Sequence, residues 1–163
     1  MEIFIDKNDD SKSAKGGVYA LGNFDGVHLG HKEIISNVIK ISRSKKIPSG
    51  VLIFDPHPRN YFNPKLDDFI LSDIKTRSYL LEKTKLDFLG ILKFDEAMSN
   101  LSPREFIEKV IKDRVGVSHL IVGYNFRFGK NREGDVEILS KICSEYNIDL
   151  TIIEQVKNKE LIF

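Results

Sequence analysis

Short apolar runs alternate along the chain with longer segments in which apolar residues recur every three or four positions. Short continuous apolar runs are typical of strands that are buried on both faces of a sheet. These runs occupy residues 18–22, 51–54, 88–94, 119–122 and 150–153. The helical spacing predicts helices over residues 31–43, from Ser72 or Asp73, from residue 103 and over 135–146.

This alternation predicts an α/β fold, namely a Rossmann-like, doubly wound parallel sheet of about five strands with helices on both faces. Residues 3–5 predict a further short edge strand. If the five runs are ordered 3-2-1-4-5 across the sheet, the first and the fourth are neighbours. A ligand crevice then opens at their carboxyl ends. The chain places two unusual loops there, residues 22–31 and 123–130.

The first loop combines two histidines with three glycines at a predicted helix start. His28 and His31 are three positions apart, and the helix is expected to begin near Gly30. Free backbone N–H groups and the positive end of the helix dipole then face the loop. This arrangement predicts a phosphate site, where imidazoles stabilise the charge that develops when an α-phosphate is attacked. The glycines that allow close backbone approach are Gly22, Gly26 and Gly30.

Two other interpretations of the histidine pair are weaker. A single loop histidine is usually solvated or bonded to backbone, but here two of the four histidines of the chain lie in one glycine-bounded loop. A zinc site would have only His28, His31 and Asp25 as local ligands, with no cysteine nearby. The sequence therefore favours phosphate chemistry.

Two further segments place aromatic rings beside the predicted crevice. Pro56 and Pro58 stiffen the loop that leads to Phe62, and residues 125–128 carry two phenylalanines around a guanidinium group. Aromatic and apolar side chains on a rigid loop suit a flat ring system. For Phe126, packing in the core is an equally good interpretation.

Composition and charge narrow the class of protein. With 163 residues the chain fits one domain, and its net charge of +1 argues against general nucleic-acid binding. It has no apolar run of about 18 residues, as a membrane span needs. The single cysteine, Cys143, excludes an internal disulfide and is expected to be buried, and His119 is expected to be structural. We therefore expect a cytoplasmic protein without nucleic-acid or membrane partners.

The motif His28-Leu29-Gly30-His31 resembles the HxGH signature of the nucleotidyltransferase superfamily. The longer string over residues 22–31, GNFDGVHLGH, is similar to that of the bacterial FAD synthetases, the bifunctional riboflavin kinase/FMN adenylyltransferases. Residues 55–58 and 122–135 resemble further motifs of the same family, so that the resemblance extends over about residues 17–156.

The resemblance implies transfer of AMP from ATP to FMN, which yields FAD and pyrophosphate, with Mg²⁺ accompanying ATP. It implies catalytic or ATP-positioning roles for His28, His31 and Asn125. It implies ATP contacts at Gly22, Asn23, Phe24, Asp25, Gly26, Gly30, Gly123 and Arg127. It implies flavin contacts at Pro56, Pro58, Phe62 and Phe128.

The family also has a later Ser/Thr-x-x-Arg segment and a riboflavin kinase domain, which residues 1–163 lack. We therefore expect residues 1–163 to be a single, C-terminally truncated adenylyltransferase domain, and the full-length protein to carry a covalently linked kinase domain. One alternative is a related transferase that acts on another phosphate substrate, such as a cytidylyltransferase or a pantetheine-phosphate adenylyltransferase. Another is a module that binds flavin or nucleotide without turnover.

Overall fold

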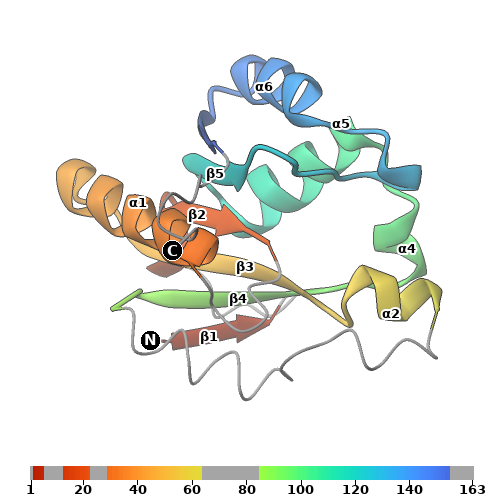
Figure 1. Cartoon of the computed structure of the whole chain (residues 1–163), viewed down its shortest axis with the longest axis horizontal. Helices are drawn as coiled ribbons and strands as arrows, with labels where there is room; N and C mark the ends of the chain where they lie inside the picture. Colours follow the sequence, from red (N-terminus) through yellow and green to blue (C-terminus); the bar gives the residue numbers. More distant parts are fainter. Residues whose placement is uncertain (1, 6–12, 23–28, 64–84, 155–163) are drawn as a thin grey trace, which may run out of the picture.

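A single parallel sheet organises the molecule. The structure, a computed structural model, describes residues 2–5, 13–22, 29–63 and 85–154. Within these residues six strands lie in the order β1-β4-β3-β2-β5-β6, and every neighbouring pair is parallel (Figure 1). The strands are β1 Glu2–Ile5, β2 Val18–Leu21, β3 Ser49–Asp55, β4 Phe88–Lys93, β5 His119–Gly123 and β6 Asp149–Ile153.

The observed strand order confirms the prediction. The five apolar runs became β2 to β6 in chain order, and the run at residues 3–5 became the edge strand β1. Strands β2 and β3 are buried over nearly their whole length, as continuous apolar strands in a covered parallel sheet must be. The neighbouring pair β2 and β5 lies where the chain reverses its direction of winding, which is where doubly wound sheets bind their ligands.

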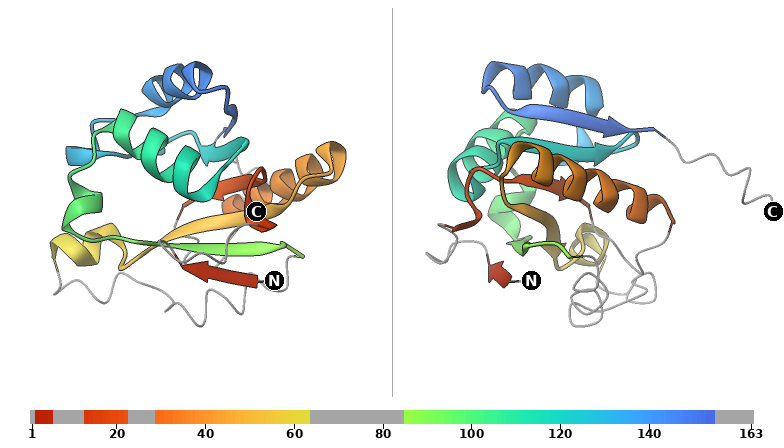
Figure 2. Two further views of the ribbon diagram at one scale, coloured as in Figure 1. Left: turned by 180° about the vertical axis from the view of Figure 1, so that it is seen from behind. Right: turned by 90° about the vertical axis from the view of Figure 1, so that its left-hand side faces the viewer.

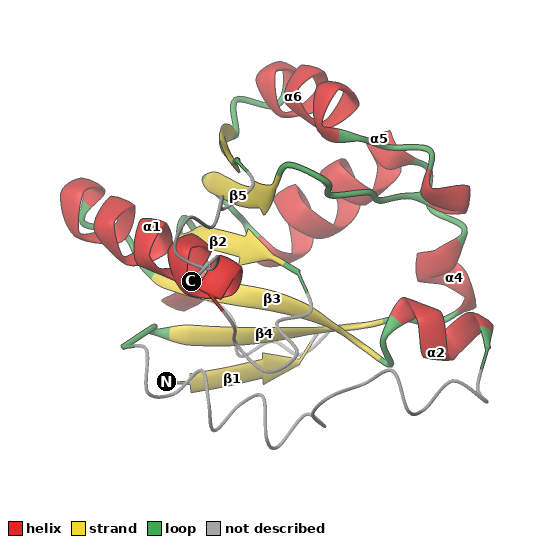
Figure 3. Cartoon of the chain, viewed as in Figure 1, coloured by secondary structure: helices red, strands yellow, loops and turns green. Residues whose placement is uncertain are grey.

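Helices cover both faces of the sheet, as predicted (Figures 2 and 3). Ile35 and Val38 of α1 pack on one face, and Ile107 and Leu139 of η3 and α6 pack on the other. None of the helices in the described ranges is both long and apolar enough to cross a bilayer. The helical segments are α1 Leu29–Lys45, α2 Pro58–Phe62, α4 Glu96–Ser99, α5 Pro103–Glu105, η3 Phe106–Val115, η4 Lys130–Arg132 and α6 Val136–Glu145.

Local capping explains where the helix predicted from residue 103 begins and ends. The Ser102 hydroxyl accepts from the Glu105 N–H at 3.1 Å, and the Ser102 N–H donates to the Glu105 carboxylate at 3.0 Å. The segment then continues from α5 into the π-helix η3, which the apolar spacing does not predict. It stops at Gly116, whose φ of 74° lies in the left-handed region. The helix predicted from Ser72 or Asp73 lies outside the described residues.

Candidate active site

The two loops of the predicted crevice leave the same end of the sheet. Strands β2 and β5 are neighbours in parallel register, with Val18 opposite His119 and Ala20 opposite Ile121. The chain leaves β2 toward α1 on one face of the sheet, and it leaves β5 toward α6 on the other. Ligands of doubly wound sheets bind at such a point, because the two loops diverge there and leave a gap between them.

The helix that follows β2 begins where the first loop predicts. Helix α1 starts at Leu29, so Gly30 and His31 lie in its first turn. This first turn contains no acidic residue, and the first four N–H groups of a helix have no partner within the helix. Its N-terminal end is therefore suited to an anion. Gly22, which donates its N–H to the Leu52 carbonyl at 3.1 Å, precedes the loop. The predicted site residues Asn23, Phe24, Asp25, Gly26 and His28 lie outside the described residues.

The end of β5 faces the beginning of α1. A Cβ atom on Gly123 would lie 3.5 Å from Asn125 Oδ1 and 4.0 Å from Ile34 Cδ1. Ile34 lies in the second turn of α1, which begins at Leu29. The structure thus brings Gly123 and Asn125, from one predicted loop, close to the second turn of α1, one turn after Gly30 and His31 in the chain. Asn125 and Arg127 are both exposed.

The loop after β5 closes into a small hairpin that fixes two stacked phenylalanines. Phe128 and Gly134 exchange backbone hydrogen bonds of 3.1 and 2.9 Å. The Phe126 and Phe128 rings stack at 5.5 Å with an interplanar angle of 12°. Phe128 is only 5% exposed, so most of its surface packs in the core and little is left for the flavin contact predicted for it. Phe126 is half-buried.

The proline loop after β3 presents an exposed aromatic ring. The Asp55–Pro56 peptide bond is cis, and Pro58 opens the short helix α2. Phe62, at the end of α2, is 68% exposed, which is the exposure that its predicted flavin contact requires. Its ring lies edge-on against that of Tyr61, with the two ring centroids 5.1 Å apart.

A continuous row of aromatic rings joins the two predicted flavin segments, and sequence reasoning missed its middle members. The ring centroids of Phe62 and Phe94 lie 5.9 Å apart, and those of Phe94 and Phe54 lie 5.4 Å apart. Phe106 then lies 6.0 Å from Phe54 and 6.0 Å from Phe128. Phe54 lies near the end of β3, and Phe94 directly follows β4. Aromatic residues at the carboxyl ends of parallel strands lie at the same end of the sheet. Their positions in the sequence could therefore have indicated that Phe54 and Phe94 lie close together.

Two side chains outside this site behave as predicted. Cys143 is buried, and burial raises the pKa of its thiol to about 11, so that the thiol is unreactive at neutral pH. His119 is buried at the amino end of β5, and both of its ring nitrogens have hydrogen-bond partners. In the part of the chain that the structure describes, no group of three His, Cys, Asp or Glu side chains could hold a metal ion.

Comparison with known proteins identifies the family. The family model described as FAD synthetase matches residues 10–162. The chain belongs to the FAD synthetase family. It is 34% identical over 142 residues to the bifunctional riboflavin kinase/FMN adenylyltransferase of Buchnera aphidicola subsp. Schizaphis graminum, which covers 86% of this chain and 46% of that protein. It is 31% identical over 146 residues to the Haemophilus influenzae protein of the same name, which covers 90% and 47%.

The solved structures agree on the fold. A crystal structure titled as a macrolide-efflux protein from Streptococcus pneumoniae superposes with a TM-score of 0.82 at 23% identity, over 98% of this chain and 52% of that one. The chain spans about half the length of the curated FAD synthetase relatives that it matches. Family membership confirms the resemblance read from residues 22–31, whereas the roles of the individual site residues remain predictions.

Proposed function

We propose that this domain transfers AMP from ATP to FMN and releases FAD and pyrophosphate. The observation that carries the proposal is that, in a member of the FAD synthetase family, the chain leaves the neighbouring strands β2 and β5 at one point of the sheet. Helix α1 begins there at Leu29, and a Cβ on Gly123 at the end of β5 would lie 4.0 Å from Ile34 in the second turn of α1. This is the position at which doubly wound sheets bind nucleotides.

The proposed reaction is a direct displacement at phosphorus. An oxygen of the FMN phosphate forms a bond to the α-phosphorus of ATP, while the bond from that phosphorus to the bridging oxygen of the β-phosphate breaks. The electron pair of the broken bond leaves with pyrophosphate, and no covalent enzyme intermediate forms. Negative charge builds on the α-phosphate and on the leaving group, so hydrogen-bond donors aimed there accelerate the step.

The N-terminal end of α1 supplies such donors. Its free N–H groups and dipole would bind the phosphates of ATP, and His28 and His31 would stabilise the charge that develops during transfer. Gly22 and Gly123 end adjacent strands without a Cβ, which allows the nucleotide to lie against the backbone. The Asn125 amide would position the nucleotide, and the exposed Arg127 guanidinium would pair with phosphate. Mg²⁺ would arrive with ATP, held by oxygens of the triphosphate.

The aromatic row supports FMN as the acceptor over the substrates of related transferases. Phe62 and Tyr61 of α2, together with Phe94, form a cluster of rings at 5.1 to 5.9 Å beside Pro56 and Pro58. A flat tricyclic ring gains from stacking and apolar contact of this kind. A cytidylyl acceptor or pantetheine phosphate carries no such ring, so the row favours a flavin acceptor over both.

We propose that the riboflavin kinase activity in the names of the relatives belongs to the part of those proteins that this chain does not match. The chain matches just under half of each bifunctional relative, and its site residues all belong to the predicted adenylyltransferase crevice. We expect the purified chain to make no FMN from riboflavin and ATP. In the full-length protein a linked riboflavin kinase domain would supply that FMN.

Turnover by the purified 163-residue chain tests the proposal. The chain is incubated with ATP, Mg²⁺ and FMN, and FAD and pyrophosphate are quantified by chromatography and a coupled assay. Riboflavin and pantetheine phosphate replace FMN in parallel reactions. Formation of FAD only with FMN supports the proposal. Binding of FMN and ATP in calorimetry without any FAD formed would instead identify a binding module.

A further inference from the structure

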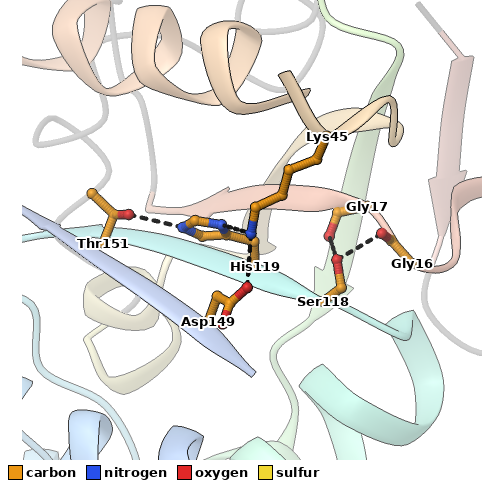
Figure 4. Close-up of polar contacts among 7 residues, drawn as sticks. All are labelled: Gly16, Gly17, Lys45, Ser118, His119, Asp149 and Thr151. Atoms are coloured by element: carbon orange, nitrogen blue, oxygen red, sulfur yellow. Dashed lines mark hydrogen bonds and ion pairs between the residues drawn. The ribbon is translucent and has the colours of Figure 1, made fainter. Parts of the chain in front are cut away.

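A polar cluster joins the last residue of α1 to the amino ends of β5 and β6 (Figure 4). The proposed active site lies at the opposite, carboxyl end of the strands. Lys45 Nζ lies 2.9 Å from His119 Nδ1 and donates to Asp149 Oδ2 at 2.7 Å. On the other side of the imidazole ring, His119 Nε2 lies 2.8 Å from Thr151 Oγ1. One side chain of α1 thus contacts the first residues of two neighbouring strands.

These contacts define the protonation state of His119. A lysine ammonium group can only donate hydrogen bonds, so the Nδ1 atom that faces it must accept. The ring hydrogen therefore sits on Nε2 and is donated to the Thr151 hydroxyl. A neutral ring of this tautomer cannot take a proton from Thr151, which excludes a second, hydrolase-like centre built on these residues.

The surroundings keep the ring neutral. His119 is only 7% exposed, and burial together with the Lys45 ammonium lowers its pKa, while the Asp149 carboxylate partly opposes this effect. On the other neighbouring strand, β2, the residue opposite His119 is the apolar Val18. Ser118, which precedes His119, donates to the Gly16 carbonyl at 2.7 Å. Among the described residues, the charged groups that act on the ring are therefore Lys45 and Asp149.

We infer that His119 is a pH-sensitive latch, which in its neutral form holds the last turn of α1 on β5 and β6 through Lys45. When His119 gains a second ring proton, Nδ1 can no longer accept, and two cations face one another at the distance of a hydrogen bond. Lys45 must then turn away from the ring. The helix itself already ends at this point, because Lys46 has a φ of 56° in the left-handed region.

Nuclear magnetic resonance of the whole chain without substrates tests the latch. In the unmodified protein, the ring nitrogen shifts of His119 should report a hydrogen on Nε2 at neutral pH. The ring should titrate below the ordinary histidine range, and the backbone amides of Lys45 and Lys46 should shift with the same midpoint. His119→Asn, which keeps an acceptor near the Nδ1 position without a titrating ring, identifies the signal and should abolish the amide titration.

Two lysine variants complete the test. Lys45→Met removes the ammonium group, so the His119 midpoint should move upward. Lys40→Met, an exposed lysine of the same helix, should leave the midpoint unchanged. Both substitutions keep a good helix former on the helix surface. A hydrogen on Nδ1 at neutral pH, an unchanged midpoint in Lys45→Met, or amides of the last turn that ignore the titration would each overturn the latch.

Discussion

The two ends of the sheet use their polar groups in opposite ways. At the amino end, polar side chains are satisfied within the protein, as where the Asp87 carboxylate accepts from the Ser49 N–H at 3.0 Å and from its hydroxyl at 3.2 Å. At the carboxyl end, Asn125, Arg127 and Phe62 are exposed. Groups bonded within the protein hold the fold together, whereas groups that face solvent remain available to a ligand. Substitutions at the two ends should therefore separate stability from activity.

The largest effect is expected at the two histidines of the predicted phosphate site, His28 and His31. Replacing His28 or His31 by Ala should lower kcat by about 10²–10³-fold, by analogy with loss of one oxyanion-hole donor. The melting temperatures of the variants show whether a lower kcat reflects lost chemistry or lost folded protein. Steady-state kinetics and thermal unfolding of the same preparations provide both measurements.

A matched control comes from the amino end of the sheet. Ser118→Ala removes the hydrogen bond to the Gly16 carbonyl and should lower the melting temperature while kcat stays unchanged. Full turnover in both histidine variants would contradict the proposed stabilisation of charge. Loss of kcat in Ser118→Ala without loss of folded protein would contradict the division between the two ends.

Two glycines of the segment that follows β5 should separate an effect on stability from an effect on ATP binding. A Cβ on Gly134 would lie 2.5 Å from the Phe128 ring, so Gly134→Ala should lower the free energy of unfolding by about 1–3 kcal/mol through overpacking. Gly123→Ala has room, because its nearest neighbours lie 3.5 and 4.0 Å away. It should unfold normally in urea yet bind ATP more weakly, since its methyl group would occupy the proposed nucleotide path. Equal losses of stability in the two variants would refute this distinction.

Phe62 should affect flavin affinity more than folding. Phe62→Ala removes a ring that is 68% exposed, so the melting temperature should barely move. Loss of stacking should cost about 1–2 kcal/mol of FMN binding, or roughly five- to thirtyfold in Kd. Calorimetric titration with FMN measures the change, and Phe62→Tyr serves as the control that keeps the aromatic ring. An unchanged Kd in Phe62→Ala would remove Phe62 from the flavin site.

The smallest effect is the dependence of stability on alkaline pH. Burial holds the folded pKa of Cys143 above its unfolded value, to about 11, so the unfolded chain loses this proton first as pH rises above the ordinary thiol range of about 9. The stability that the neutral thiol contributes is present below that pH and is lost above it. Urea unfolding between about pH 9 and 10 should show the decline, and Cys143→Ala should flatten it. An equally steep decline in Cys143→Ala would assign it to other groups.

Local patterns predicted the elements that are determined locally. The capping residues Ser102 and Glu105 predicted a helix start, and continuous apolar runs predicted the strands of a covered sheet. The contacts between distant segments were not predictable in this way. The row through Phe54, Phe94 and Phe106 depends on which strand and helix ends meet at one edge. The contact of Lys45 with Asp149 depends on β6, which lies about a hundred residues later in the chain.

The same limit applies to the candidate site. The glycine-bounded histidine motif is a contiguous string, so the sequence was enough to identify its family. Phe128 illustrates the opposite case, because its position in a family motif did not indicate how deeply it is buried. Its ring packs over Gly134, where a Cβ atom would lie 2.5 Å from it.

The central claim is tested most directly by following the α-phosphate of ATP. The purified chain is given FMN, Mg²⁺ and ATP that is labelled either in the α-phosphate or in the γ-phosphate. We expect the α-label to appear in FAD, in an amount equal to the pyrophosphate released. The γ-label should appear only in pyrophosphate. Absence of labelled FAD with the folded chain and saturating substrates, or transfer of the γ-label to a flavin, would contradict this claim.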